Sequence, residues 1–90
     1  MHVIELAFDA NPARLAARPA HREYLAKLHA EGVVVVSGPW TDDTGALLIF
    51  DVDRARLDEI LADDAYYRTP GVTVASVREW SPIIGRALDV

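Results

Sequence analysis

The chain has no cysteine among its 90 residues, and that absence excludes several kinds of chemistry. Without a thiol there is no disulfide framework, no thiolate nucleophile and no cysteine-based metal site. The histidines, at His2, His21 and His29, do not have the i,i+4 spacing that is typical of metal ligands on one helix. We therefore expect no metal site in this protein.

Basic residues are also scarce. Nine lysines and arginines stand against 14 aspartates and glutamates, which leaves a net charge of −5. The basic residues are scattered along the chain and form no run, so the sequence offers little electrostatic basis for binding a phosphate backbone. We expect no nucleic-acid partner.

Long apolar runs are absent too. The longest uncharged apolar stretch, residues 32–40, is far shorter than the roughly 18 residues that a membrane-spanning helix needs. The first residues, Met1 to Leu6, lack the charged and apolar regions of a signal peptide. We expect no membrane partner and a cytoplasmic location.

Apolar residues, in contrast, are abundant and make up 51% of the sequence. The length predicts a single domain over residues 1–90, and a chain this short buries too little surface to build a strong core alone. The surplus of apolar residues therefore favours additional buried surface, supplied by self-association.

The first third of the chain is predicted to form a strand and a long helix. Residues 2–8 alternate between apolar and mixed positions, as in a strand with one apolar face. Pro19 should interrupt a continuous helix, so we expect only a short turn over residues 11–18. The main helix is predicted over residues 19–31, with Gly32 ending it in the left-handed conformation.

The remainder of the chain is predicted to add three strands and one helix. The predicted elements are a strand over 33–37, a strand over 46–52, a helix over 54–63, a strand over 72–80 and an irregular tail over 83–90. Gly38 and Pro39 are expected to end the first of these strands.

The order βαββαβ predicts an α+β fold of the ferredoxin-like type, an antiparallel sheet with both helices on one face. Residues 33–37 and 46–52 are apolar on both sides, so we expect these strands at the centre of the sheet. The face without helices would then need a cover. We predict a two-fold homodimer in which two copies pack sheet face to sheet face.

His21 is the residue that points most directly to a function. At about 100° per residue, it shares the apolar stripe of the main helix with Leu25 and Leu28. A right-handed crossover brings the ends of the first two strands and the start of this helix to one edge of the sheet. The polar and aromatic residues expected at that edge are Asp9, Arg18, His21, Ser37, Gly38, Trp40, Asp64 and Tyr66. Their convergence predicts a ligand pocket.

The two ionisable residues at the centre of this edge each have a structural alternative. His21 is either an acid–base catalyst or a satisfied core histidine. Asp64 is either the carboxylate that orients it or the exposed end of a frayed helix. His2 and His29 are expected at the surface.

The other residues of this edge are candidates for binding a ligand. Arg18 is either an anion anchor or a solvated residue at a helix start. Ser37 lacks the surroundings of a nucleophile, and together with Gly38 it more readily offers a hydroxyl or an amide to a ligand. Trp40 and Tyr66 either cover the pocket or simply pack.

Several of these residues also carry a family resemblance. The motifs are Arg18-x-x-His21, the Leu-His-Ala-Glu-Gly run at 28–32, Ser37-Gly38-Pro39, and Ala62-Asp63-Asp64-Ala65-Tyr66 followed by Gly71-Val72. In this order and spacing they resemble the YciI-like (YCII-related) family over residues 2–82. The resemblance implies a dimeric α+β barrel fold and a His-Asp dyad, which carries over to His21 and Asp64.

The chain departs from the family pattern at Ala65, because the family has proline in its Asp-Pro-aromatic motif. Loss of the proline loosens the turn that aims the aspartate. The neighbouring Asp63 is a second carboxylate, so the sequence leaves the choice between Asp63 and Asp64 open.

The resemblance also bears on function, since distant relatives with this barrel include muconolactone-isomerase-type enzymes and a dehydrochlorinase. We interpret the chain as a small-molecule enzyme of isomerase or lyase type that needs no cofactor. His21 would relay a proton and Asp64 would orient it, while Arg18 or the backbone of residues 37–38 holds an anionic or cyclic ligand. The alternative is a non-catalytic binding or accessory module that uses the same pocket.

Overall fold

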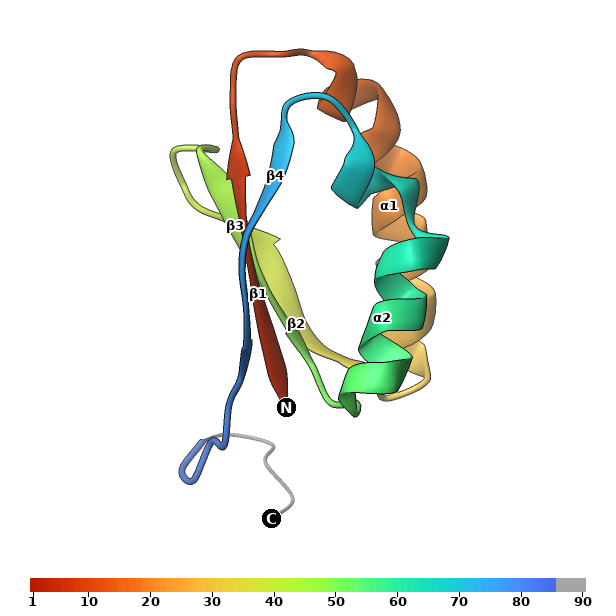
Figure 1. The fold of residues 1–90 in the computed structure, drawn as a ribbon, viewed down its shortest axis with the longest axis vertical. Coiled ribbons are helices and arrows are strands. Elements are labelled where there is room, and N and C mark those ends of the chain that lie inside the picture. The colour runs from red at the N-terminus through yellow and green to blue at the C-terminus, as the bar shows by residue number, and fades with distance from the viewer. Residues whose placement is uncertain (86–90) are drawn as a thin grey trace.

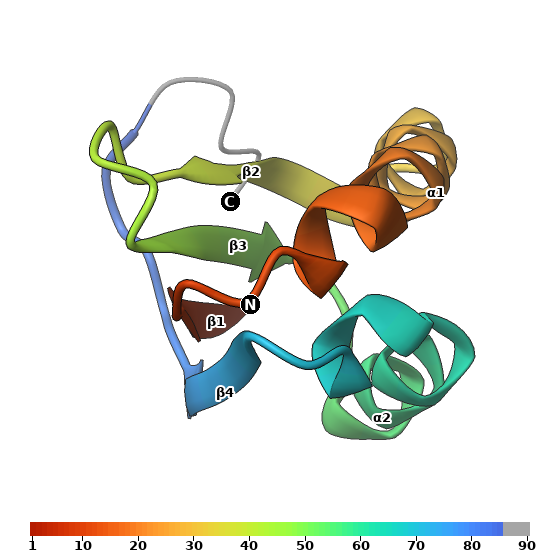
Figure 2. The ribbon, with the colours of Figure 1, turned by 90° about the horizontal axis from the view of Figure 1, so that it is seen from above.

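The fold has two layers, a four-stranded sheet and two helices that cover one of its faces (Figures 1 and 2). The structure is a computed structural model, and it describes residues 1–85. Its elements are β1 (His2–Phe8), α1 (Ala13–Ala30), β2 (Val34–Pro39), β3 (Gly45–Phe50), α2 (Arg54–Asp63), the 3-10 helix η1 (Ala65–Arg68) and β4 (Val72–Glu79). The predicted α+β, ferredoxin-like class is confirmed.

The strands lie in the order β2-β3-β1-β4, and every neighbouring pair is antiparallel. The prediction that residues 33–37 lie at the sheet centre is wrong, because β2 is an edge strand that pairs only with β3. The long connection through α1 leaves β1 free to pair on the other side of β3. Val36 is consequently 58% exposed, although its sequence context is that of a buried strand.

Strand β2 also runs through Gly38 and Pro39, where the sequence predicted its end. The amide of Trp40 donates to the carbonyl of Gly45 at 2.9 Å. Because hydrogen-bonded pairs alternate along an antiparallel ladder, the nitrogen of Pro39, one residue earlier, points away from β3. An edge strand tolerates a proline in that position, since no ladder bond is lost.

Helix α1 begins at Ala13 and passes through Pro19 without interruption, so the predicted turn over residues 11–18 is wrong. A proline inside a helix costs about 3 kcal/mol because it removes one hydrogen bond and crowds the preceding turn. Burial of the helix stripe offsets that cost: Arg14, His21, Leu25 and Leu28 are all buried along it. The predicted stop is confirmed, with Gly32 at φ 79°.

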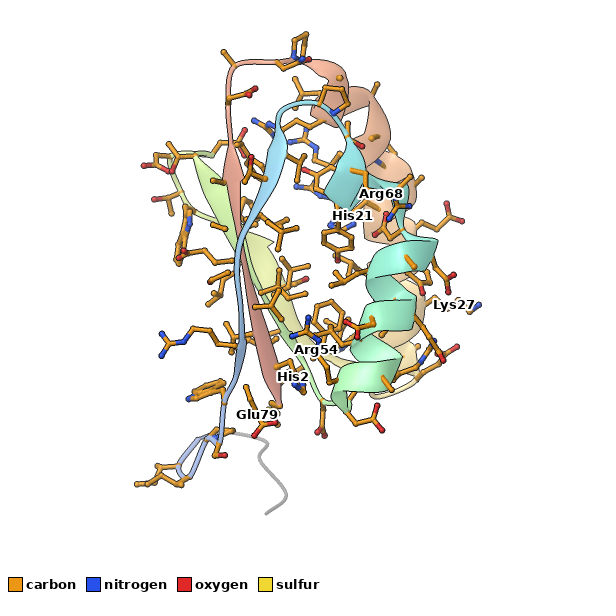
Figure 3. All side chains as sticks on the ribbon, viewed as in Figure 1. His2, His21, Lys27, Arg54, Arg68 and Glu79 are labelled. Atoms are coloured by element: carbon orange, nitrogen blue, oxygen red, sulfur yellow. The ribbon has the colours of Figure 1, made fainter. Side chains whose placement is uncertain are left out.

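The core lies between the helices and the sheet face that they cover, which we call the inner face. Its fully buried side chains are Ile4, Leu6, Leu28, Leu48, Phe50, Leu57 and Ile60. His2 belongs to this face as well and is 6% exposed, so its predicted surface position is wrong. The alternation that buries Ile4 and Leu6 also turns His2 inward, where Nδ1 lies 2.9 Å from the carbonyl oxygen of Val52, and Nε2 lies near Glu79 (Figure 3).

The opposite side of the sheet, the outer face, has no helix over it (Figure 1). The strand register places Val36, Ile49 and Val3 in one row across β2, β3 and β1. Beside this row, Leu47 and Trp80 help to line a hollow of about 320 Å³. Within residues 1–85 no helix covers this face, where Val36 is 58% exposed and Ile49 is 9% exposed.

Two features concern the predicted location and the tail. Among residues 1–85, no helix combines the length and the apolar character needed to cross a membrane. The cytoplasmic location remains a prediction. Of the predicted tail over residues 83–90, Ile83 and Ile84 are exposed, and residues 86–90 lie outside the described part of the chain.

Candidate active site

A groove of about 520 Å³ lies between α1 and the edge strand β2. Helix α1 contributes Arg14, Arg18, His21 and residues further along the same stripe, and β2 contributes the whole of its length. Phe8 at the end of β1 and Tyr66 in η1 complete the same wall. The predicted convergence of strand ends, helix start and the segment after α2 is therefore present.

His21 lines this groove and forms a buried pair with Asp64. His21 projects from the apolar stripe of α1 toward the interior (Figure 3), and Asp64 follows the last residue of α2. The distance from His21 Nδ1 to Asp64 Oδ2 is 2.5 Å, and the two side chains are 8% and 7% exposed. The structure brings together residues that are 43 positions apart, and the histidine's partner is Asp64, since Asp63 is exposed.

Asp64 is held in place by the backbone as well as by His21. Its Oδ1 accepts a hydrogen bond from the amide of Tyr66 at 3.0 Å, so the carboxylate caps η1. The cap forms with alanine at position 65, where the family motif has proline. Burial by itself would raise the pKa of Asp64, but the hydrogen bonds from His21 and Tyr66 outweigh it and lower the pKa. The carboxylate is thus kept charged.

The second ring nitrogen of His21 is free for a ligand. Nε2 has no hydrogen-bond partner among residues 1–85. It is not fully buried, in contrast to Arg14 Nη1 and Tyr67 Oη, which are the buried side-chain atoms without a partner in that range. Since His21 lines the groove, Nε2 retains contact with its open space. A carboxylate on one imidazole nitrogen fixes the tautomer and increases the basicity of the other nitrogen.

Two tyrosines of η1 fix the orientation of the imidazole. The ring of Tyr66 stacks on His21 with a centroid distance of 4.0 Å and an interplanar angle of 11°. Tyr67 meets the same imidazole edge-on at 5.5 Å. Burial raises the pKa of Tyr67, so its hydroxyl stays protonated. The short η1 therefore supplies both the cap on Asp64 and the two rings around His21.

A second charged pair, Arg14 with Asp43, lies at the other end of the groove, and the sequence analysis missed it. Nη2 of Arg14 donates to Oδ2 of Asp43 at 2.7 Å, and the guanidinium carbon lies 4.4 Å from the centre of the Phe8 ring. This hydrogen bond raises the pKa of Arg14 despite burial. Arg14 precedes His21 by two helical turns on the same stripe, so a continuous helix predicts that it faces the groove. The sequence analysis missed this because it predicted a turn over residues 11–18.

The chain is similar to known proteins in both sequence and fold. The sequence profile of the YCII-related domain matches residues 1–81. The chain belongs to the YCII-related family. No curated protein matches this YCII-related chain significantly.

A solved structure with the same fold is 5-chloro-2-hydroxyhydroquinone dehydrochlorinase from Burkholderia phenoliruptrix AC1100, in complex with 2,5-dihydroxybenzoquinone. The TM-score is 0.56 at 19% sequence identity, and the match covers 90% of the YCII-related chain and 94% of the dehydrochlorinase chain. Likeness at this level of identity establishes the shared fold.

The predicted binding residues of this YCII-related domain divide into two groups. Arg18, Ser37, Gly38 and Tyr66 all line the groove. Trp40 does not: its side chain is 44% exposed at the start of the β2–β3 loop. Its role in binding remains a prediction.

Two other polar residues, Asp9 of the predicted edge and His29, which was predicted at the surface and is exposed, make other contacts. Asp9 is exposed, and its Oδ1 accepts a hydrogen bond from the amide of Asn11 before α1 begins. His29 lines the far end of the groove, where its Nδ1 lies 2.8 Å from the carbonyl oxygen of Val34. Within residues 1–85, no group of three or more histidines and carboxylates is arranged to hold a metal ion.

Proposed function

We propose that this YCII-related domain is a cofactor-independent enzyme that transfers protons on a small molecule, with His21 as the acid–base residue and Asp64 as the residue that orients it. The observation that carries the proposal is the buried pair of His21 Nδ1 with Asp64 Oδ2 at 2.5 Å, combined with an Nε2 that is open to the groove. A charged, buried carboxylate stabilises the imidazolium that forms when Nε2 accepts a proton.

The reaction class follows from what such a base can do. In an isomerisation, Nε2 removes a proton from one carbon of the substrate and returns it to another. In a dehydrochlorination, Nε2 removes a proton, the electron pair forms a new double bond, and chloride leaves with its bonding electrons. The solved structure of the same fold is named as a dehydrochlorinase, which supports the lyase alternative.

Binding residues are available on both sides of the imidazole. Arg18 lines the groove one turn before His21, and residues 37–38 lie opposite on the edge strand. We propose that this side of the groove holds an anionic or cyclic ligand, with Tyr66 keeping the imidazole in position. The non-catalytic binding module remains the alternative. The short distance between His21 and Asp64 and the open groove favour the enzyme.

We further propose that the protein is a homodimer whose two sheets pack through their outer faces. The hollow lined by Val3, Leu47, Ile49 and Trp80 and the exposed Val36 support this arrangement, because exposed aliphatic side chains mark interaction surfaces. Val36 in particular is 58% exposed in the single chain. Light scattering of the purified protein should give twice the chain mass, and a monomer at micromolar concentration would contradict the proposal.

The catalytic proposal is tested by assaying chloride release from 5-chloro-2-hydroxyhydroquinone, and isomerisation of cyclic lactones, with wild type and variants. His21→Ala should lower the rate by about 100-fold or more, since a positioned acid–base group contributes about 10²–10⁴-fold. His29→Ala is the matched control, because His29 lines the same groove without a carboxylate partner. Binding of these compounds without turnover would instead support the binding module.

A further inference from the structure

Arg14 is a buried cation with more hydrogen-bonding capacity than the protein uses. The residue is 8% exposed, and its recorded hydrogen bond is the one from Nη2 to Asp43. Nη1 is buried and has no partner at hydrogen-bond distance within residues 1–85, while the Tyr66 side chain adds to Asp43 in raising the pKa of Arg14. An unsatisfied nitrogen on a buried guanidinium is costly, and such groups in native proteins call for an explanation. The groove that Arg14 lines suggests one.

The charge of the groove suits an anion. Three arginines line it, Arg14, Arg18 and Arg22, against Asp43 on its wall and the Asp64 carboxylate that is hydrogen-bonded to His21, an excess of one positive charge without counting the histidines. Arg18 and Arg22 make no ion pair with any of residues 1–85. The chain as a whole has a net charge of −5, so this local excess is against the general trend. A positive cleft in an acidic protein attracts and concentrates anionic ligands.

The two partners of the Arg14–Asp43 pair differ in burial, and this difference decides which one can leave. The side chain of Arg14 is 10% exposed, whereas that of Asp43 is 47% exposed on the β2–β3 loop. A released Asp43 carboxylate returns to water at little cost, but a released guanidinium would be left buried without a counter-ion. A competing anion would therefore displace Asp43 and keep Arg14 in place.

The spacing along α1 limits the size of the ligand. Arg14 and His21 lie two turns apart on one stripe, about 10 Å along the helix axis, and their side chains reach into the same groove. The wall between them is largely apolar and includes Phe8, Ala46 and Leu48. A molecule with one ring and a carboxylate at one end matches this distance and this wall.

We propose that Arg14 is the anion anchor of the groove and that Asp43 is a resident counter-ion which the ligand displaces. A carboxylate on the ligand pairs with both Nη1 and Nη2 of Arg14, the bidentate geometry that guanidinium groups favour. The ring of the ligand then lies along the apolar wall, and its other end faces Nε2 of His21. This inference rests on the proposed function for the position of the reacting end, and it names the substrate class as small ring-containing carboxylic acids.

The test compares 4-hydroxybenzoate with its neutral counterpart 4-hydroxybenzamide, with affinities for the intact protein measured by titration calorimetry. Wild type should bind the benzoate at least about tenfold more tightly than the benzamide, a difference of about 1.4 kcal/mol. Arg14→Met should abolish that preference, and Arg22→Met, a matched change at an exposed arginine of the same groove, should retain it. Asp43→Asn should tighten binding of the benzoate several-fold and leave binding of the benzamide unchanged.

Several results would overturn the proposal. These are a wild type that binds neither compound, a preference that survives Arg14→Met but disappears in Arg18→Met, or weaker benzoate binding in Asp43→Asn. If Arg14→Met does not fold, Asp43→Asn decides the question alone, because a purely structural ion pair gives no gain in affinity when it is broken. His21→Ala separates the two proposals: it should remove turnover and preserve the preference for the benzoate.

Discussion

The two faces of the sheet use the same strands for opposite purposes. On β3, Leu48 and Phe50 point to the inner face and belong to the core, whereas Leu47 and Ile49 point to the outer face, away from both helices. The inner face also carries the buried His2, and His21 of α1 points toward it; each has a hydrogen-bond partner. The row on the outer face, described above, is aliphatic.

This difference shows what a helix layer adds to a sheet. Helices α1 and α2 bring side chains to the inner face at an angle to the strands, so a histidine from one helix and an aspartate from the end of the other can meet above it. Within residues 1–85, no helix covers the outer face. We therefore propose that catalysis belongs to the inner side of the sheet and that a second copy of the chain covers the outer face.

The largest difference between the two faces is expected when adjacent residues of β3 are truncated. Leu48 is 1% exposed, so Leu48→Ala should lower the free energy of unfolding by about 3 kcal/mol, whatever the protein concentration. Leu47→Ala, on the outer face, should act mainly through the proposed dimer, so its effect should depend on protein concentration. Urea unfolding of both variants, at protein concentrations that span about a hundredfold, checks this. Equal losses at all concentrations would contradict the division between the faces.

A smaller effect is expected from the polar pair of the inner face. Asp64→Asn removes the charge that His21 faces and leaves one acceptor oxygen for two donors, so we expect a loss of about 2 kcal/mol. Asp63→Asn, at the exposed neighbouring position, should change stability by less than about 0.5 kcal/mol. Denaturant unfolding at neutral pH measures both. A similar loss in the two variants would mean that the buried pair contributes nothing specific to stability.

The smallest expected effect is on how the free energy of unfolding changes at acidic pH. Because the pKa of Asp64 is lowered below its ordinary value of 3.8, the folded protein releases this proton more readily than the unfolded chain. The resulting stabilisation is complete above about pH 4 and is lost as the pH falls through the folded pKa. As the pH falls from about 5 to about 2.5, the urea midpoint of wild type should therefore decrease more steeply than the urea midpoint of Asp64→Asn. Parallel curves would show that Asp64 makes no such contribution.

Some features of the fold follow from local sequence and were predicted correctly. The alternation over residues 2–8 defines β1, Asp53 caps α2 by accepting from the amide of Arg56 at 2.8 Å, and Gly32 ends α1. Each is decided within a few residues, by side-chain period, by capping or by the left-handed conformation that glycine adopts freely. The inward direction of His21 belongs to the same class, because helical spacing to Leu25 and Leu28 defines it.

The same local rules failed where distant residues decide the outcome. Pro19 is a helix breaker by local criteria, but the burial of the stripe from Arg14 to Leu28 keeps the helix continuous. Val36 has the sequence surroundings of a core residue, yet β2 is an edge strand because β1 occupies the other side of β3. Propensity describes a segment in isolation, and in both places the contacts made by the rest of the chain outweigh it.

The sequence alone therefore determined the fold class, the family and the presence of an inward histidine, because each depends on periodicity or on a motif that is continuous in the chain. Only the tertiary structure decided that Asp64, and not Asp63, is the partner of His21, and that Arg14 meets Asp43 across 29 residues. The reason is geometric. The chain leaves the helical conformation at Asp64, whose φ of −102° and ψ of 107° are extended, so the two adjacent carboxylates point in different directions, Asp63 to water and Asp64 to the interior. The contacts of η1 with α1 and with α2 hold this arrangement.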